Sequence, residues 1–574
     1  MVLLAAALVA AACGDDDGSA PASSGSGSTG GSTTTLAPQT GGVLAFGEFS
    51  EPVGLDPIVS TGHGTTGAIE MAAVYDTIVR YNHTTKKYEN RTADTVTPNA
   101  DFTEWVVKIR PGIKFSDGTD YDAAAVVFGM QRHRSGVEGG PTAANCAEFI
   151  ACPRNTTVSN AIMPWVKTVI ATDALTVKFT LTEPWAGFPY LLATEPGMIP
   201  SPTALKKCDG TKPPRECAFS LKPVGAGPFT VTSFTPKESI VMARNAGYWG
   251  GQVYLDGLKF TNAGDGGGTK TYESFKAGQL QAAFLRAPDA VASAKADKVP
   301  GWSTMNQMGA VLRFNTGLAV NCAGQKPEPV CIGRPDGPGP VTTVTKDVKV
   351  RQAIVAAIDP KVVDQRANNG KGLPGTELLQ SDFPWYPTGV QGTPKYDPDL
   401  AKKLVAEAKA AGWDGKVRLL YQNSPTGQNT GLAVQSLLQA VGIDAQLDAT
   451  KDVGAFVAQY LTNRDFDVVG TGTSVSPDDG AMVNLAQNFA SNSGSNVTGF
   501  KSPIVDAALK ELRAASTDDQ KKAAYKRIVE ELYAQAPTYA WSKVEELTIW
   551  SPKVHGITET MKSTVLFDKA WIEK

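Results

Sequence analysis

A glycine-rich stretch near the start of the chain, Gly62 to Gly67, has the G-x-G-x-x-G spacing that can cradle a dinucleotide phosphate. That chemistry needs a buried strand immediately before the glycines and an acidic residue about 20 positions later, which bonds the ribose. Residues 58–61 make a poor strand because they follow a proline. We therefore interpret the glycines as the entrance to a helix expected over 68–75, and not as a nucleotide site.

Six of the seven cysteines form close pairs that could be disulfides or metal ligands. The pairs are Cys146 with Cys152, Cys208 with Cys217, and Cys322 with Cys331. None has the C-x-x-C spacing of a zinc site, and the four histidines are scattered along the chain. An even number of cysteines in local pairs is typical of exported proteins. We expect three disulfides, no metal site and no cofactor.

Three common catalytic motifs are absent from the sequence: G-x-S-x-G, G-x-x-x-x-G-K-[ST] and H-E-x-x-H. The net charge of −3 comes without any basic stripe that would indicate nucleic acid binding. At 574 residues, the chain is long enough for two or three subdomains. We expect a binding protein and not an enzyme, with an exported hydrolase built from scattered residues as the alternative.

Residues 105–134 predict a strand, two turns and a helix. The apolar residues Trp105, Val107 and Ile109 alternate along the chain as in a half-buried strand. Ser and Asp at 116–119 bond to nearby backbone, and Gly118 supplies a positive φ, so a turn is expected there. The helix that follows has three possible caps: Thr119, Asp120 or Asp122.

This block resembles the bacterial extracellular solute-binding proteins of family 5, the peptide and nickel receptors of ABC transporters. Members read roughly L-R-x-G-V-K-F-H-D-G, and this chain has I-R-P-G-I-K-F-S-D-G at 109–118. Further family motifs follow in order, among them P-V-G-A-G-P-F at 223–229 and V-R-Q-A-I at 350–354. A hairpin over 167–181 and a proline-led helix over 183–192 also match. The resemblance covers residues 42–574.

The resemblance implies an α/β fold, the two-lobe periplasmic-binding-protein fold of class II and peptide-receptor type, with an extra subdomain. The expected parts are lobe one at approximately 41–72, 219–310 and 536–574, the extra subdomain at 73–218, and lobe two at 311–535. In this family the lobes close on a solute and deliver it to a membrane permease and its ATPase. The implied cargo is a peptide or peptide-like solute, and the implied state is a monomer. An opine, an oligosaccharide, a metal chelate, or a sensor on the same fold are the alternatives.

The resemblance also implies where the solute binds. Peptide receptors read G-W-x-x-D-Y-x-D-P at 470–479, where this chain has Thr471 for the tryptophan and Ser474 for the aspartate that anchors the peptide ammonium. A hydroxyl is a weaker partner for an ammonium than a carboxylate, so a free α-amino group should not be required. Asp478 or Asp479 either replaces the anchor or caps a helix expected near Ala481. The residues expected at the ligand are Glu48, Ser50, Gly470, Thr471, Gly472, Ser474, Asp478 and Asn496.

The first 40 residues predict export and tethering. The apolar run 2–12 ends in small residues before Cys13, which resembles a lipoprotein signal in which Cys13 is acylated. An ordinary secretory peptide without lipid is the alternative. Residues 14–40 are rich in Asp, Ser, Gly and Thr, so we expect a disordered tether. We expect a protein held by lipid on the outer face of the cell membrane, periplasmic or at the cell surface.

Overall fold

The computed structural model describes residues 36–60, 66–133, 138–142, 144–152, 163, 165–317, 320–321, 338–339, 343–561 and 563–574. The chain divides into two compact units, Met1–Pro38 and Gln39–Lys574, and every described helix and strand lies in the second. The expected signal peptide with Cys13, most of the tether, the first glycines of the 62–67 stretch, and the pair Cys322 with Cys331 lie outside the described residues.

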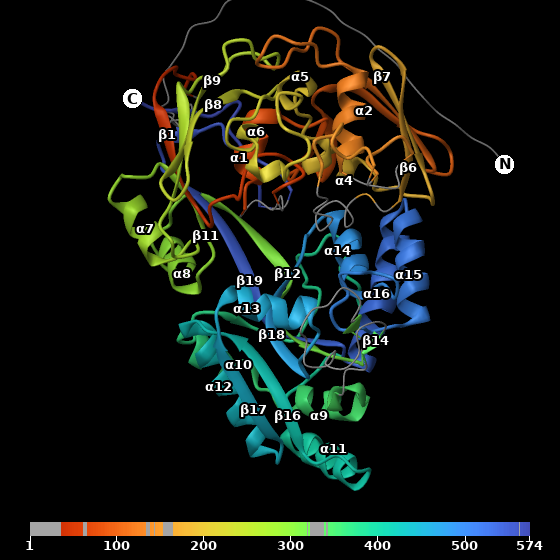
Figure 1. Ribbon diagram of the computed structural model, residues 1–574. Helices are drawn as coiled ribbons and strands as arrows, with labels where there is room; N and C mark the ends of the chain where they lie inside the picture. The colour runs from red at the N-terminus through yellow and green to blue at the C-terminus, as the bar shows by residue number, and fades with distance from the viewer. Residues whose placement is uncertain are drawn as a thin grey trace, which may run out of the picture. The chain divides into compact units, whose positions relative to one another are not determined.

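A large sheet runs through the second unit (Figure 1). Its strand order is β17-β16-β18-β12-β19-β11-β1-β10-β9-β8, and β15 pairs with β19 beside this path. The strands are β1 Val43–Glu48, β8 Phe229–Thr235, β9 Ser239–Arg244, β10 Gly257–Asn262, β11 Ala282–Leu285, β12 Gly301–Phe314, β15 Leu373–Pro374, β16 Lys416–Gln422, β17 Asp444–Lys451, β18 Val468–Val475 and β19 Thr538–Trp550.

The two longest strands, β12 and β19, lie side by side and connect the two halves of the sheet (Figure 1). Their register shifts between Asn306 and Ala310, which marks a bulge in β12. Met308 and Gly309 in this bulge have φ of 70° and 62°. A Cβ on Gly309 would lie 2.3 Å from the carbonyl oxygen of Ser542, so the bulge needs a glycine there.

The block at 105–134 belongs to a smaller sheet with the order β4-β5-β7-β6. Its elements are β4 Ala93–Pro98, β5 Glu104–Ile109, α2 Ala123–Arg132, β6 Val166–Asp173 and β7 Thr176–Leu181. The expected strand, helix and hairpin are confirmed. Asp122 is the cap, because its side chain accepts a hydrogen bond from the Ala125 amide at 2.8 Å.

The P-V-G-A-G-P-F motif docks on the end of α1, Ala68–Tyr75, the helix expected there. The Gly227 amide donates to the carbonyl of Val74 at 2.8 Å. A Cβ on Gly225 would lie 2.3 Å from the same oxygen, so the close approach requires glycine. The carbonyl of Gly225 in turn accepts from the Ser116 amide at 2.9 Å. Two of the family motifs therefore pack on each other as scaffold.

Strand–helix–strand order follows β12, as expected. The helical elements are α9 Val348–Ala357, α10 Pro360–Asn368, α11 Pro398–Ala410, α12 Pro425–Ala440, α13 Val453–Val457, the π-helical turn η5 Ala458–Thr462, α14 Gly480–Phe489, α15 Pro503–Ala514 and α16 Asp518–Gln535. Helix α12 begins at Pro425. Ser424 caps it and Pro425 opens its first turn. Gly431 lies inside the helix and allows it to pack closely, because a Cβ at this position would lie 2.7 Å from the Leu447 side chain.

The helix expected over 183–192 is wrong for most of its length, since only α4, Pro189–Leu192, forms. The backbone amides before it donate elsewhere: Trp185 to the carbonyl of Phe102, and Ala186 to that of Arg513. These bonds fix the segment before α4 against two distant parts of the chain.

The other described elements complete the unit. They are η1 Glu195–Gly197, α5 Pro202–Leu205, η2 Pro214–Glu216, α6 Ala218–Leu221, α7 Thr269–Lys276, α8 Pro288–Ala296, η4 Val344–Lys346, and the paired strands β2 Val79–Asn82 with β3 Lys87–Asn90, β13 Val320–Asn321 with β14 Pro338–Gly339, β20 Val554–His555 with β23 Trp571–Ile572, and β21 Thr558–Glu559 with β22 Val565–Leu566.

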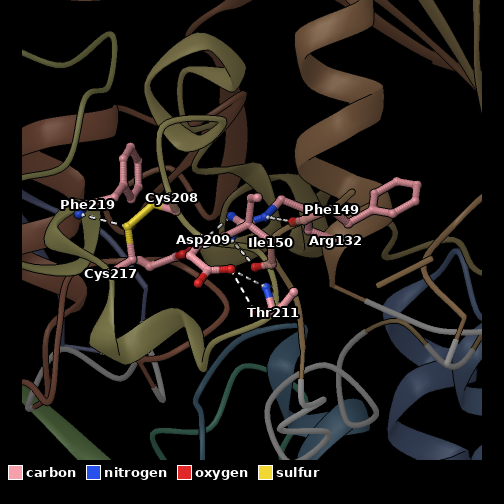
Figure 2. Close-up of a disulfide and its surroundings, with 9 residues drawn as sticks. Arg132, Phe149, Ile150, Cys208, Asp209, Thr211, Cys217 and Phe219 are labelled. Carbon is pink, nitrogen blue, oxygen red and sulfur yellow. Dashed lines mark hydrogen bonds and ion pairs between the residues drawn. A yellow bond between two sulfur atoms is a disulfide. The ribbon is translucent and has the colours of Figure 1, made fainter. Parts of the chain in front are cut away.

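Two of the three expected disulfides lie within the described residues, and both form. Cys146 and Cys152 have Cα atoms 5.3 Å apart, and those of Cys208 and Cys217 are 5.7 Å apart. Figure 2 shows the second bridge with Arg132, whose guanidinium donates to the carbonyls of Phe149 and Ile150 in the first cysteine loop. The two disulfide loops therefore pack against the core of the unit and not only at its surface.

Candidate functional site

A cavity of about 310 Å³ lies beside the two long strands. Strands β12 and β19 form its floor, α8 and the residues just before it form one wall, and the α10–β15 connection with the start of α12 forms the other. The lining residues include Arg286, Val291, Lys295, Ala310, Asn368, Lys371, Leu373, Thr426, Trp541, Lys543 and Glu545. Segments from both halves of the sheet thus enclose one space.

The walls of this cavity are charged but balanced. Each of four basic side chains lies near a carboxylate: Lys295 with Glu545 at 2.6 Å, Lys371 with Asp289 at 2.8 Å, Lys543 with Glu377 at 3.7 Å, and Arg286 with Glu546 at 3.7 Å. Trp541 adds an aromatic surface on the floor. Such an arrangement can hold a polar solute against an apolar face.

Four of the expected ligand residues lie together on β18: Gly470, Thr471, Gly472 and Ser474. The strand runs from Val468 to Val475. Gly472 pairs with Ala310, which lines the cavity, and Ser474 pairs with Met308 in the bulge. These residues therefore lie beside the bulged part of β12.

Gly470 leaves room for an aromatic ring to pack directly against the strand. A Cβ at this position would lie 2.0 Å from the ring of Tyr421, a residue of β16. The Tyr421 hydroxyl is buried and has no hydrogen-bond partner among the described residues, and burial raises the pKa of its phenol. Gly470 thus has a packing role on this strand.

The two aspartates after β18 are engaged by protein groups. Asp478 is buried, and its Oδ1 accepts from the Gly480 amide at 2.8 Å in the first turn of α14. Asp479 accepts from the Tyr88 hydroxyl at 3.1 Å and from the Lys521 ammonium at 2.7 Å. Asp479 therefore joins β3 to α16.

Glu48 and Ser50 are placed apart from the residues of β18. Glu48 ends β1, which lies four strands from β18 in the same sheet, or about 19 Å at the usual strand spacing. Burial and the neighbouring Glu70 raise the pKa of Glu48 well above its ordinary value. Burial also raises the pKa of Glu70 to about 7. At least one of these carboxyls holds a proton in mildly acidic solution.

Asn496 organises its own loop. Its side-chain amide donates to the carbonyl of Phe500 at 2.8 Å, and its oxygen accepts from the Thr498 hydroxyl at 2.8 Å. The side chain is buried, at 4% exposed. These bonds hold the segment between α14 and α15.

The sequence reading overlooked Arg313 on β12, which donates to the Thr473 hydroxyl at 2.6 Å. A signal for it existed, because Arg313 is a cation within the otherwise apolar run Ala310–Phe314. It also overlooked Trp541, because the apolar residues around it, such as Tyr539, are typical of a buried core strand.

In the part of the chain that the structure describes, no three His, Cys, Asp or Glu side chains are placed to hold a metal ion. His133 is fully enclosed, and burial lowers its pKa to about 3. No described helix combines the length and the apolar character needed to cross a membrane.

The family model of bacterial extracellular solute-binding proteins, family 5 Middle, matches residues 87–496. The chain belongs to this family. The glutathione-binding protein GsiB of Escherichia coli (strain K12) is 27% identical over 381 residues, which are 65% of this chain and 63% of that protein. The match therefore covers less than two thirds of the length of this curated relative.

Solved structures show that family 5 membership comes with the expected fold. The oligopeptide-binding protein AppA of Bacillus subtilis, in complex with a nonapeptide, has a TM-score of 0.70 and 20% identity, and the match covers 94% of this chain and 100% of that one. The binding protein AgaA from A. tumefaciens R10, in complex with agropinic acid, has a TM-score of 0.68 and 22% identity, covering 93% and 99%. The α/β two-lobe periplasmic-binding-protein fold is confirmed.

Proposed function

We propose that this protein is the extracytoplasmic receptor of an ABC importer that captures a peptide or peptide-like solute by lobe closure. The observation that carries the proposal is the cavity at the junction of the two halves of the sheet, where a solute would touch both. A ligand that contacts both sides only when they are closed stabilises the closed state. The peptide in AppA and the glutathione in the name of GsiB favour peptide cargo.

The bulge at Met308–Gly309 is the proposed hinge, because it lies where the pairing of β12 with β18 begins, directly after the part of β12 that leads to the N-terminal half of the sheet. Lobe one would then comprise approximately residues 41–72, 219–310 and 536–574, lobe two 311–535, and the extra subdomain 73–218. A bulge bends and twists a strand locally, so this is where a rotation costs least.

The proposed binding surface combines the cavity with the neighbouring part of β18. Gly470, Thr471, Gly472 and Ser474 would face the solute from lobe two, and Glu48 and Ser50 from lobe one. Asp478 and Asn496 would shape the segments that follow β18. Because Ser474 offers a hydroxyl and no charge, N-acetylation of a bound peptide should weaken binding little.

The partners and location also belong to this proposal. The receptor would act as a monomer with a permease and an ATPase, tethered by a lipid on Cys13 outside the cell membrane. Intact mass measurement of the membrane-extracted protein tests the lipid. A mature chain that begins after an ordinary cleavage site, without an acyl group, would contradict it.

A thermal-shift screen of the exported domain tests the cargo. Pools of short peptides should raise the melting temperature, while oligosaccharide and metal-chelate pools should not. Trp541→Ala serves as the matched variant, because it empties the floor of the cavity. Trp413→Ala serves as its control, because Trp413 is half-buried against the same hydrophobic cluster but does not line the cavity. If only sugars, chelates or opines raise the melting temperature, the cargo is a non-peptide solute, which is the second candidate. The complex of AgaA with agropinic acid favours this second candidate.

A further inference from the structure

Arg286 lies at the edge of the large sheet where three parallel strands end. Strand β1 pairs in parallel with β10 and with β11, so the carboxyl ends of all three strands lie at one edge (Figure 1). Glu48 is the last residue of β1, and Arg286 directly follows β11. Open α/β sheets commonly bind ligands at such an edge. Arg286 also lines the cavity beside β12 and β19, so it connects that cavity to the end of β1.

The side chain of Arg286 packs on Phe49, the residue that follows Glu48. The guanidinium carbon lies 5.4 Å from the centroid of the Phe49 ring. Phe49 in turn meets Phe284 of β11 edge-on, with ring centroids 5.9 Å apart. The backbone amide of Arg286 donates to the carbonyl of Gly267 at 3.0 Å. These contacts place the guanidinium beside the segment that is expected to face the solute from lobe one.

The guanidinium of Arg286 has unused hydrogen-bond donors. Within the described residues it donates no hydrogen bond, and its carboxylate neighbour Glu546 is 3.7 Å away. Glu546 is already engaged, because it accepts from the Asn306 amide at 2.6 Å and from the Ser563 hydroxyl at 2.5 Å. By contrast, the guanidinium of Arg132 donates to one carboxylate and two carbonyls. The Arg286 side chain is 30% exposed, so a solute can reach it.

The lining of the cavity is basic, although its ion pairs balance the charge as a whole. Besides Arg286, the charged residues that line it are Lys295, Lys371, Lys543 and Glu545. Glu545 is occupied by Lys295 at 2.6 Å. The carboxylates that accompany Lys371 and Lys543 are not among the lining residues. The described surface that a solute meets therefore favours an anion.

Glu48 opposes an anion less than an ordinary glutamate would. Its side chain is buried, and its Oε1 has no hydrogen-bond partner among the described residues. Burial and the neighbouring Glu70 raise the pKa of Glu48 well above its ordinary value. A protonated carboxyl carries no charge and can donate a hydrogen bond to an anionic oxygen.

We propose that the solute carries a carboxylate, which binds to the guanidinium of Arg286 on the lobe-one side of the cavity. The planar fork of a guanidinium matches the two oxygens of a carboxylate. Phe49 covers one face of the guanidinium and leaves its N–H edge to the solute. A peptide offers a carboxylate at its C-terminus or on an acidic side chain. This inference rests on the proposed function, since it specifies the chemistry of the captured solute.

Calorimetry on the exported protein tests the inference with three pools of short peptides: neutral peptides with a free carboxyl terminus, the same peptides amidated, and amidated peptides with one glutamate. A pool with a carboxylate should bind about tenfold more tightly than the amidated neutral pool, which lacks the charge-assisted bonds. Preference for the first pool identifies the terminal carboxylate, and preference for the third identifies a side-chain carboxylate. Equal affinity for all three pools would overturn the inference.

Variants assign the carboxylate to Arg286. Arg286→Gln should weaken the favoured carboxylate pool about tenfold and leave the amidated neutral pool unchanged, a difference that a merely structural role would not produce. Arg244→Gln is the control, because Arg244 belongs to the same lobe, is partly exposed and does not line the cavity. If Arg286→Gln does not fold, Arg286→Lys decides. It keeps the charge without the fork, so it should lose about threefold for the carboxylate pool, and no loss would contradict the inference.

The outcomes separate this inference from the proposed function. Wild-type affinity of Arg286→Gln for the carboxylate pool would overturn the inference and leave the receptor intact. Loss of the preference in Lys543→Gln instead would move the carboxylate to Lys543 and likewise overturn the assignment. Binding of neutral oligosaccharides alone would overturn the inference as well. A wild-type protein that binds no peptide, sugar, opine or chelate would contradict the proposed function, and the inference with it.

Discussion

Arg132 and Asp56 form an ion pair whose side chains are 1% and 2% exposed. Arg132 also holds the carbonyls of Phe149 and Ile150, so four acceptor contacts depend on one guanidinium (Figure 2). Arg132→Ala leaves the carboxylate of Asp56 buried and unpaired, which should lower the free energy of unfolding by about 3–5 kcal/mol. Urea unfolding measures this loss.

The control for that prediction is Arg244→Ala. Arg244 pairs with Asp256 at 3.1 Å, but the two side chains are 34% and 51% exposed. Its loss should cost about 1 kcal/mol or less. If both variants lose the same amount, the burial of the Arg132 pair has no energetic consequence.

Glu48 and Glu70 make stability depend on pH at the residue scale. The pKa of Glu70 rises from 4.5 to about 7 on folding, so between these values the folded state binds more protons than the unfolded state. The free energy of unfolding should therefore fall as pH rises from about 4.5 to about 7, by an amount on the order of 2–3 kcal/mol. Glu70→Gln should flatten this part of the profile in urea unfolding at several pH values, whereas an unchanged slope would assign the dependence to other groups.

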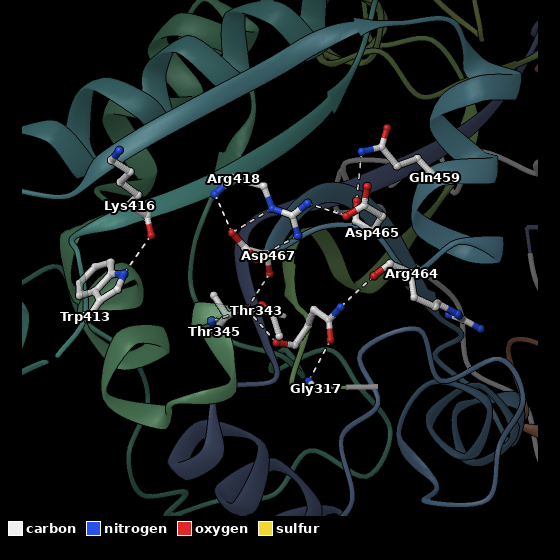
Figure 3. A network of polar contacts seen from close by, with 11 residues as sticks. Gly317, Thr343, Thr345, Trp413, Lys416, Arg418, Gln459, Arg464, Asp465 and Asp467 are labelled. Atoms are coloured by element: carbon white, nitrogen blue, oxygen red, sulfur yellow. Dashed lines mark hydrogen bonds and ion pairs between the residues drawn. The ribbon is translucent and has the colours of Figure 1, made fainter. Parts of the chain in front are cut away.

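Single residues were predictable where their partner is local. Asp122 caps α2 through an amide three positions away, and the two close cysteine pairs within the described residues form bridges. The pairing of Arg418 with Asp465 and Asp467 was not predictable, because it joins β16 to residues more than 45 positions further along the chain (Figure 3). The sequence alone does not indicate which cation a carboxylate will pair with.

At the scale of elements, the bulge in β12 requires a glycine at position 309. Its φ is 62°, and an added Cβ would meet the Ser542 carbonyl at 2.3 Å. Gly278 has a φ of 75° with nothing near the added Cβ, so it isolates the conformational cost. Gly278→Ala should lose about 1–2 kcal/mol of unfolding free energy, and Gly309→Ala clearly more. Equal losses in urea unfolding would mean that the bulge adapts.

The disulfide loops give a second prediction at this scale. Non-reducing peptide mapping should find Cys146 bridged to Cys152, Cys208 to Cys217, and Cys322 to Cys331. Replacing Cys208 and Cys217 by alanine should cost about 2–3 kcal/mol by the loop-entropy estimate. Free thiols at 322 and 331 in the mapped protein would remove the third bridge.

Elements with regular periodicity were predicted well, and those set by distant contacts were not. The strands and hairpin of the small sheet follow from alternation along the chain. The segment 183–188 is not helical, and its amides at Trp185 and Ala186 donate to Phe102 and Arg513, contacts that no local pattern shows. Helix α12 contains Gly431, where close packing on the Leu447 side chain leaves no room for a Cβ, and that contact with β17 is not visible in the local sequence.

At the scale of the whole molecule, motifs that recur in order predicted the family and its fold, but not which parts would pack together. One hydrophobic core joins the small sheet, through residues such as Val107 and Phe179, to α14–α16, through Leu485 and Tyr525. Arg513 pairs with Glu183 across the same boundary. These contacts link residues more than 300 positions apart, so the amino-acid order does not reveal them.

That boundary leads to a prediction about closure. The Tyr88 hydroxyl donates to Asp479, which also binds Lys521, so β3 and α16 are joined through one carboxylate. If this junction belongs to the closed state, Tyr88→Phe should weaken solute binding about fivefold, although Tyr88 does not line the cavity. Tyr396→Phe, at an exposed position, should bind as the wild type does. Scattering should also show a larger radius of gyration for Tyr88→Phe with solute present, whereas equal affinity and equal radius would mean that the junction persists when the lobes open.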